Sequence, residues 1–345
     1  MAVFVLFQLL AALFTPHPLA SLGVASLRSA FIVALLAAGV WLRRSERLRP
    51  LLWGYLAVFV TAWVSTVWQF AANPQGLLEI RLLHPYYYFV TLGLLAAIAL
   101  WLTVSWKGGS WLWRLPVIVF SLATLAASGS RGPILALIVG AVATALCGHR
   151  RYLWGILLTG MLGLAAVAAL PQLREAASVE RLVTLGLTGR DEVWQGALEA
   201  FRQNPVGGAG PYQIGPYLEF LYKDGCNLTP WLMNEGVGCP AWLEPFRGAW
   251  LIAHNLLLHS LAETGILGTL GLLALLGLGA YATWRSRDGL LVSIFWGFMA
   301  MSLIDVVTAV PSMGFSELFW VGIGIALTQT GLAGARTPPD SLEVA

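Results

Sequence analysis

The chain alternates between long apolar runs and short polar links. Most runs are close to the length of about 20 residues that an α-helix needs to cross a bilayer, and charges or turn residues separate them. This pattern predicts about ten membrane-spanning helices. We expect these helices over residues 2–14, 19–42, 51–71, 85–104, 112–128, 132–147, 152–170, 254–281, 289–309 and 315–331. The first run is short for a full span.

Composition agrees with this pattern. Of the 345 residues, 58% are hydrophobic and 11% are charged, whereas soluble domains average about 25% charged residues. This composition excludes an ordinary soluble domain. The expected fold class is therefore an all-α polytopic membrane protein, with the lipid bilayer as its surroundings.

Basic residues gather in every second link between the expected helices. They are Arg43, Arg44, Arg47, Arg49, Lys107, Arg114, Arg150, Arg151, Arg285 and Arg287. Links that are rich in arginine and lysine face the cytoplasm in most membrane proteins. We therefore expect both termini in the cytoplasm and the remaining links on the exported side.

The longest polar link, residues 171–253, lies on the exported side. It separates N-terminal transmembrane helices (1–170) from C-terminal ones (254–331), which a tail (332–345) follows. A loop of this length is more often functional than idle. Within it, an amphipathic helix is expected from Asp191 to Gln203. The apolar residues that recur there at helical spacing are Val193, Trp194, Ala197, Leu198 and Phe201.

Two of the three cysteines, Cys226 and Cys239, fall in this exported loop. An oxidising compartment predicts a disulfide between them. The alternative is a pair of buried thiols in an aromatic cluster. Cys147, at the cytoplasmic end of a span, should be free. The cysteines have no nearby histidine pairs, so they form no zinc signature, and we expect no metal site.

Three side chains at the expected membrane boundary are candidates for chemistry. Arg131 follows Ser130 at the start of a helix, where free backbone N–H groups favour an anion. The alternative is an arginine that reaches towards lipid headgroups. Arg190 begins the loop helix, and its guanidinium group suits a diphosphate because it can donate two parallel hydrogen bonds. The alternative is a solvated cation paired with Asp191 or Glu192.

His254 lies where the loop meets the next apolar run. A histidine exchanges protons near neutral pH, so at this boundary it can act as a base on a lipid-borne substrate. The alternative is a buried histidine that is hydrogen-bonded to Asn255 or to loop backbone. Glu263 is expected to form hydrogen bonds in helix packing, on the opposite helix face from His254.

Three sequence blocks resemble the O-antigen ligase and polymerase superfamily of bacterial envelope glycosyltransferases. The first block is Ser128–Gly132, and the second is Gly189–Trp194, which leads to Asn204–Gly210. The third is Ala253–Leu256 together with Glu263–Gly265. Their order, spacing and sidedness all match the superfamily.

The resemblance implies a metal-independent, inverting membrane glycosyltransferase of the GT-C type that uses no cofactor. It implies a location in the bacterial inner membrane, with the active site facing the periplasm. The donor would be a glycan on undecaprenyl diphosphate. His254 matches the general base, and Arg131 and Arg190 match the arginines that hold the diphosphate. Ser130, Asn255 and Glu263 are candidate supporting residues.

Several functions remain open at this point. A polymerase, which we favour, would pass the glycan to a second lipid-linked repeat unit, with a chain-length regulator as a further candidate partner. A ligase would pass it to lipid A-core. A protein O-oligosaccharyltransferase would often carry a larger C-terminal region. A transporter is the alternative from another class, with Arg28, Glu263 and Asp305 as an intramembrane polar pathway. We expect no nucleic acid partner.

Overall fold

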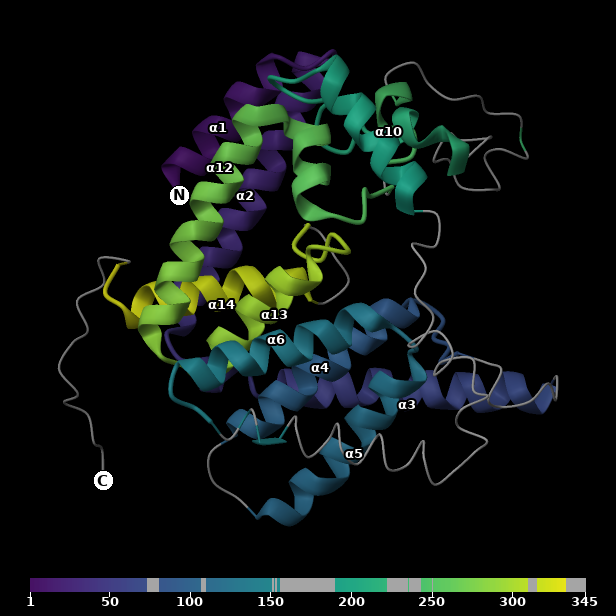
Figure 1. Ribbon diagram of the computed structural model, residues 1–345, viewed down its shortest axis with the longest axis vertical. Helices are drawn as coiled ribbons and strands as arrows, with labels where there is room; N and C mark the ends of the chain where they lie inside the picture. The colour runs from purple at the N-terminus through teal and green to yellow at the C-terminus, as the bar shows by residue number, and fades with distance from the viewer. Residues whose placement is uncertain are drawn as a thin grey trace. The chain divides into compact units, whose positions relative to one another are not determined.

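Figure 1 shows the computed structural model of the chain, in which the described elements are helices. The structure describes residues 1–72, 81–106, 110–150, 152, 154–155, 190–221, 235, 243–249, 251–309 and 315–332. The chain divides into two compact units. The first comprises Met1–Ala34, Gly186–Leu278 and Ser302–Pro311, and the second comprises Leu35–Leu185, Gly279–Met301 and Ser312–Ala345.

The first unit combines three apolar helices with three further elements. The apolar helices are α1 (Ala2–Leu13), the first part of α2 (Pro18–Leu42) and most of α12 (Leu256–Ser286), and the further elements are α10 (Arg190–Gln203), η2 (Gly215–Leu221) and η3 (Glu244–Phe246). Figure 1 shows α1, α2 and α12 running alongside one another. Side-chain hydrogen bonds join the three helices, because Gln8 of α1 bonds both Arg28 of α2 and the Gly268 carbonyl of α12.

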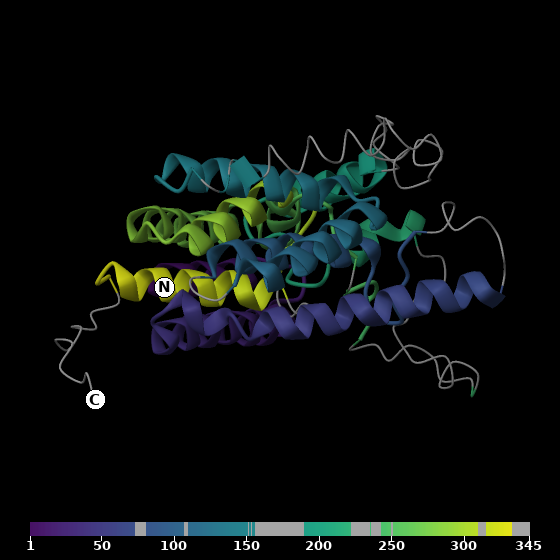
Figure 2. The same cartoon turned by 90° about the horizontal axis from the view of Figure 1, so that it is seen from below.

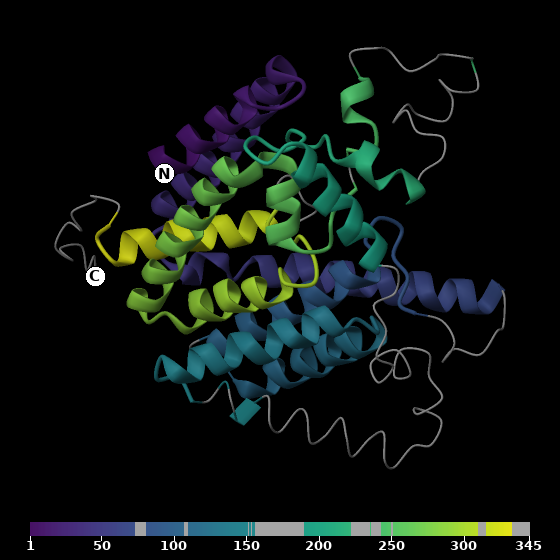
Figure 3. The same ribbon diagram turned by 45° about the horizontal axis from the view of Figure 1, so that its top comes forward.

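The second unit is a helical bundle built around two buried helices. Its remaining elements are η1 (Ser45–Leu48), α3 (Leu51–Ala72), α4 (Phe89–Ser105), α5 (Trp111–Ala127), α6 (Arg131–Leu146), α13 (Gly289–Met301) and α14 (Ser316–Gln329). Both α4 and α13 are apolar on all sides and buried almost throughout, as such a pattern predicts. In Figures 2 and 3 the teal helix α6 lies beside the yellow-green α13, and a 2.7 Å hydrogen bond joins Thr144 to Ser293 there.

Helix length and composition agree with a membrane protein. Among the described residues, three stretches are long and apolar enough to cross a bilayer: Pro18–Leu42, Ser45–Ala71 and Leu256–Ser286. Five shorter apolar helices accompany them: Ala2–Leu13, Phe89–Ser105, Leu112–Ala127, Arg131–Leu146 and Gly289–Met301. The all-helical fold class is therefore confirmed, while the number of about ten spans stays a prediction.

One expected helix is too long. The span expected over 289–309 ends at Met301, because residues 302–309 turn back towards the start of α12. The Ser302 carbonyl accepts a hydrogen bond from Leu256 N there. The expected helix over 152–170 falls almost entirely outside the described residues, as does the disulfide expected between Cys226 and Cys239. Cys147 is a free thiol.

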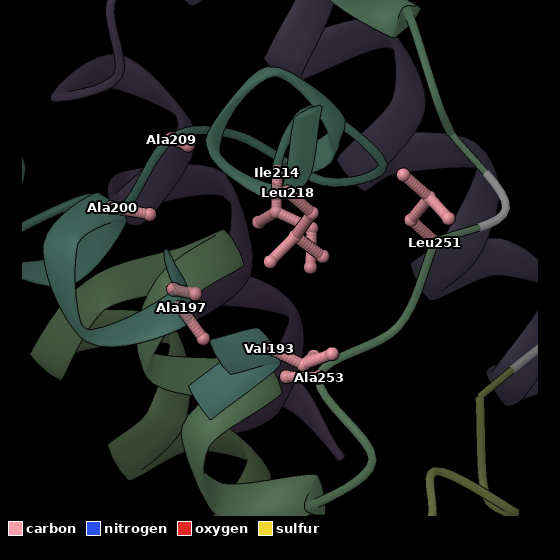
Figure 4. Close-up of a cluster of buried hydrophobic side chains, with 9 residues drawn as sticks. Val193, Ala197, Ala200, Ala209, Ile214, Leu218, Leu251 and Ala253 are labelled. Carbon is pink, nitrogen blue, oxygen red and sulfur yellow. The ribbon is translucent and has the colours of Figure 1, made fainter. Parts of the chain in front are cut away.

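The amphipathic helix expected from Asp191 to Gln203 is confirmed as α10, which begins one residue earlier at Arg190. Its buried face packs into the apolar cluster of Figure 4. The buried members of this cluster are Val193, Ala197, Ala200, Ala209, Ile214, Leu218, Leu251, Ala253 and Ala262. Because Ala253 is fully buried in this cluster, the backbone that carries the next residue, His254, is fixed against the first turn of α10.

Candidate active site

His254 contacts a carboxylate that follows it by 51 residues. Its Nδ1 lies 3.3 Å from Oδ1 of Asp305, in the turn that follows α13. The side chains of His254 and Asp305 are 37% and 14% exposed, so the imidazole reaches solvent while the carboxylate is mostly covered. Oδ1 of Asp305 also accepts a 2.8 Å hydrogen bond from Val306 N, which fixes the carboxylate. An ionised carboxylate only accepts hydrogen bonds, so it favours the tautomer in which Nδ1 is protonated and Nε2 is free to take a proton.

Asn255 builds the local backbone rather than contacting the imidazole. Its Oδ1 accepts a 3.0 Å hydrogen bond from Leu258 N, so Asn255 caps the N-terminus of α12. Its Nδ2 donates a 2.9 Å hydrogen bond to the Leu303 carbonyl. Asn255 therefore ties the helix start to the turn that holds Asp305. The residue before it, His254, has a φ of 47°, in the left-handed region.

Glu263 belongs to a separate, buried network. Its side chain is 2% exposed, and Oε2 lies 2.5 Å from Nη1 of Arg28. Oε1 accepts a 2.7 Å hydrogen bond from Tyr212 N and lies 3.6 Å from Nε2 of His259. Glu263 thus joins α2, α12 and the segment after α10 through hydrogen bonds. Burial raises the pKa of the Tyr212 phenol, although the Arg28 guanidinium opposes this shift, so the phenol is neutral at pH 7.

Gly265 breaks α12 two residues after Glu263. Its φ of 57° and ψ of −163° are outside the helical region and suit only glycine. Residues 205–210 fill the break, so that backbone groups left without helical partners are bonded. The four bonds, of 2.8 to 3.3 Å, run from Ile266 N to Pro205 O, Leu267 N to Val206 O, Ala209 N to Ala262 O and Gly210 N to Glu263 O. Non-helical backbone at membrane depth requires such internal partners.

The segment after α10 approaches the backbone of α12 so closely that glycine is needed at the points of contact. A Cβ on Gly208, whose φ is 72°, would collide with the backbone of Glu263 and Thr264. A Cβ on Gly265 would collide with the Val206 carbonyl. Two blocks that the sequence analysis singled out separately, Asn204–Gly210 and Glu263–Gly265, therefore form one joint within the first unit.

Arg190 is the first residue of α10 and is half-buried. Val193, one turn later, belongs to the same buried cluster as Ala253, and Figure 4 shows the two side chains next to each other. The first unit therefore brings the N-terminal turn of α10 to the segment that carries His254.

Arg131 lies in the second unit, where it is the exposed first residue of α6. The turn before it is held by Arg81, whose guanidinium donates hydrogen bonds of 2.8 to 3.3 Å to the Ser128 and Gly129 carbonyls and to Ser130 Oγ. The Arg81 guanidinium also lies 3.2 Å from the centre of the Phe89 ring. Ser130 therefore belongs to the structure of this turn, and Arg81 fixes the backbone from which Arg131 extends.

Sequence reasoning did not identify the roles of two of these residues, Asp305 and Arg81, in the site. Asp305 stood out as an intramembrane charge, but nothing in the sequence pairs it with His254. Arg81 lies in a link that we expect on the exported side, where basic residues are unusual, and that exception was its only signal. Among the residues that the structure describes, no group of three or more His, Cys, Asp or Glu side chains is arranged to hold a metal ion.

A family model described as O-antigen ligase matches residues 116–273, a little under half of the chain. The match begins in α5 and ends within α12, so it includes Arg131, Arg190, His254 and Glu263. Asp305 lies beyond it. A search of curated proteins gave no match to the chain.

Proposed function

We propose that this chain, which carries an O-antigen ligase domain over residues 116–273, is a polymerase of lipid-linked glycans at the periplasmic face of the inner membrane. The observation that carries the proposal is the contact between His254 and Asp305. It provides a partly exposed base with a fixed tautomer at the end of a long apolar helix, where a lipid-borne substrate can reach it.

In the proposed reaction, a hydroxyl oxygen of the acceptor glycan attacks the anomeric carbon of the donor glycan. The bond between that carbon and the diphosphate oxygen breaks, and undecaprenyl diphosphate leaves with the electron pair. Attack from the face opposite to the leaving group inverts the anomeric configuration. Nε2 of His254 takes the proton of the attacking hydroxyl, and the resulting imidazolium is stabilised by the Asp305 carboxylate.

Arg131 and Arg190 are proposed to bind the diphosphate. Each combines a guanidinium group with the first turn of a helix, and both features favour negative charge. Their charge would stabilise the negative charge that develops on the leaving group, a role that a divalent metal has in many other transferases. Activity in the presence of EDTA tests this assignment, because loss of activity on chelation would show that a metal does this work.

Asp305 is proposed as a positioning residue that acts through His254. Its carboxylate sits in a turn tied to the start of α12 by two backbone carbonyls, those of Ser302 and Leu303. The hydrogen bonds between this turn and the start of α12 thereby hold the base and its partner together. We propose that Arg81 is also a positioning residue. It holds the turn before Arg131 and so acts through that side chain.

Transfer to lipid A-core is the second candidate function, because the matching family model is described as O-antigen ligase. The contacts of the structure weaken the transporter alternative, which needs Arg28, Glu263 and Asp305 to form one polar pathway. Glu263 is bonded to Arg28, whereas Asp305 is bonded to His254, so these charges are engaged in two separate contacts of the fold.

The deciding experiment incubates the purified protein with an undecaprenyl-diphosphate repeat unit alone and separates the products on a gel. A ladder of lengthening glycans supports the polymerase. Transfer only after lipid A-core is added supports the ligase. The absence of products in both reactions, across several donor glycans, would contradict the glycosyltransferase proposal. The His17→Ala variant is a suitable positive control, because His17 is exposed and belongs to neither network.

A further inference from the structure

The second unit contains a cavity of about 490 Å³ at the end of the bundle where α2, α6 and α12 end and α13 begins. Charged side chains and a histidine dominate its lining: Arg44, Arg49, Arg287, His149, Glu46 and Asp288. Arg131 begins α6, whereas His149 follows its end. The cavity is therefore separated from Arg131 by the full length of that helix, about 24 Å at 1.5 Å per residue.

The two acids in the lining are already engaged. Oδ1 of Asp288 accepts backbone hydrogen bonds from Leu290 and Leu291, as the N-cap residue of α13. Its Oδ2 accepts hydrogen bonds from Ser45 and Gln329. These four neutral donors occupy the carboxylate oxygens of Asp288.

Two arginines remain to give the cavity its charge. Glu46 forms its ion pair with Arg49 at 3.2 Å, and the Arg49 guanidinium also lies over the Trp106 ring. Within the described part of the chain, neither Arg44 nor Arg287 forms an ion pair. Both side chains are exposed. An anion that enters the cavity therefore meets two guanidinium groups that are not held in an ion pair with a carboxylate of the described residues.

The exposed surface beside this cavity carries aromatic side chains. Arg287 also lines a second cavity, of about 420 Å³, together with Tyr281, Trp284 and Arg285. Tyr281 and Trp284 are 54% and 44% exposed, in the last turns of the candidate span α12. Exposed tryptophan and tyrosine at helix ends mark the headgroup level of a bilayer. Trp41 and Trp53, which flank η1, are exposed in the same way.

We propose that the basic cavity binds the headgroup of an anionic glycerophospholipid. Arg44 and Arg287 would bind the phosphodiester oxygens, and Tyr281 and Trp284 would pack against the glycerol and the first acyl carbons. The shared Arg287 joins the polar cavity to the one lined by Tyr281 and Trp284, which favours a phosphate with an apolar tail over a free phosphate ion. Basic pockets between helices at the cytoplasmic side are a common form of lipid headgroup site.

Native mass spectrometry of the delipidated, detergent-purified full chain tests this site. The protein is titrated with phosphatidylglycerol, with zwitterionic phosphatidylcholine and with inorganic phosphate. The variant Arg44→Gln/Arg287→Gln removes both proposed ligands. The matched control is Arg43→Gln/Arg47→Gln, which removes the same charge near η1 from residues outside the cavity lining. Each pair contains one residue in the left-handed backbone region, Arg287 or Arg43.

We expect the cavity variant to bind phosphatidylglycerol on the order of tenfold more weakly, and the control variant to change binding less than about twofold. An equal loss in both variants would show diffuse surface attraction and overturn the site. Binding of inorganic phosphate through Arg44 and Arg287, without binding of phosphatidylglycerol, would overturn the lipid assignment. If the double variant does not fold, Arg44→Gln alone replaces it, because Arg44 is exposed.

Discussion

Arg28, which is half-buried, forms an ion pair with the buried Glu263 across 235 residues of sequence, with 2.5 Å between Nη1 and Oε2. The same carboxylate holds the backbone of Tyr212, so one side chain fastens two helices and the segment after α10. Such a pair fixes one arrangement of its elements, since the Glu263 carboxylate without Arg28 would be a buried charge that has lost its partner.

Removal of one partner of this pair should destabilise the protein strongly. We expect Arg28→Ala to lower the free energy of unfolding by about 3–5 kcal/mol, because the Glu263 carboxylate would stay buried. The matched control is Arg202→Ala, which breaks an exposed pair with Glu199 in the same unit and should cost less than about 1 kcal/mol. Thermal unfolding in detergent measures both, and equal shifts would contradict a structural role for Arg28.

Substitution of His254 should slow glycosyl transfer without unfolding the protein. We expect His254→Asn to lower the rate by about 10² to 10⁴, the usual contribution of a general base. Asparagine tolerates the left-handed backbone at this position better than alanine does. The assay follows product formation from a lipid-linked repeat unit, with His17→Ala as the control. Nearly full activity of the His254 variant would reject the base assignment.

Asp305 should affect catalysis through the imidazole. We expect Asp305→Asn to lower kcat by between about tenfold and 10⁴-fold, with little change in KM; the upper value is that of the carboxylate in serine-protease triads. Asp305→Glu should recover part of the lost rate, which a merely structural residue would not require. Glu199→Gln, on the exposed face of α10, serves as the control. A change in KM alone would mean that Asp305 contributes to binding instead.

Arg131 and Arg190 should not tolerate lysine. A lysine keeps the charge but cannot donate the two parallel hydrogen bonds of a guanidinium group. We expect Arg131→Lys and Arg190→Lys each to lower kcat/KM by roughly tenfold or more, from the loss of one charge-assisted hydrogen bond. Arg202→Lys, near the other end of α10, should be neutral. If the two lysine variants match the unmodified protein in kcat/KM, diphosphate binding by the guanidinium fork is wrong.

The break in α12 offers a comparison within one helix. Gly265→Ala should destabilise the protein by about 3 kcal/mol or more, since the backbone conformation suits only glycine and the Cβ would collide with Val206. Gly277→Ala meets nothing within 4 Å and should be neutral or slightly stabilising, because alanine favours helix. The midpoints of thermal unfolding of the two variants test this difference. Similar midpoints would indicate that the break at Gly265 is not required for stability.

Hydrophobic pattern was sufficient to place most of the helices. The helices expected over 19–42 and 51–71 begin and end within one residue of α2 and α3, because an apolar run flanked by turn residues leaves little choice of boundary. The pattern failed at α13, which is eight residues shorter than expected. Residues 302–309 are apolar enough for a helix, but the Ser302 carbonyl accepts a hydrogen bond from Leu256 N at the start of α12 instead.

The arrangement of the site could be predicted only in part. Local motifs identified the block around His254 and the helix starts at Arg131 and Arg190, since capping and helix termini are short-range features. The contact of His254 with Asp305 depends on how two distant segments fold back on each other, and no periodicity encodes it. The same holds for Arg81, whose partners lie 47 to 49 residues away.

The joint between residues 205–210 and α12 also sets an order of assembly. The ribosome makes residues 205–210 before it makes α12. The carbonyls of Pro205 and Val206 therefore have no hydrogen-bond donor from α12 until Ile266 and Leu267 have been added. Residues 205–210 can therefore form these bonds only after α12 has been made as far as Leu267 and has bent at Gly265. During synthesis, α12 supplies the backbone partners that fix the conformation of residues 205–210.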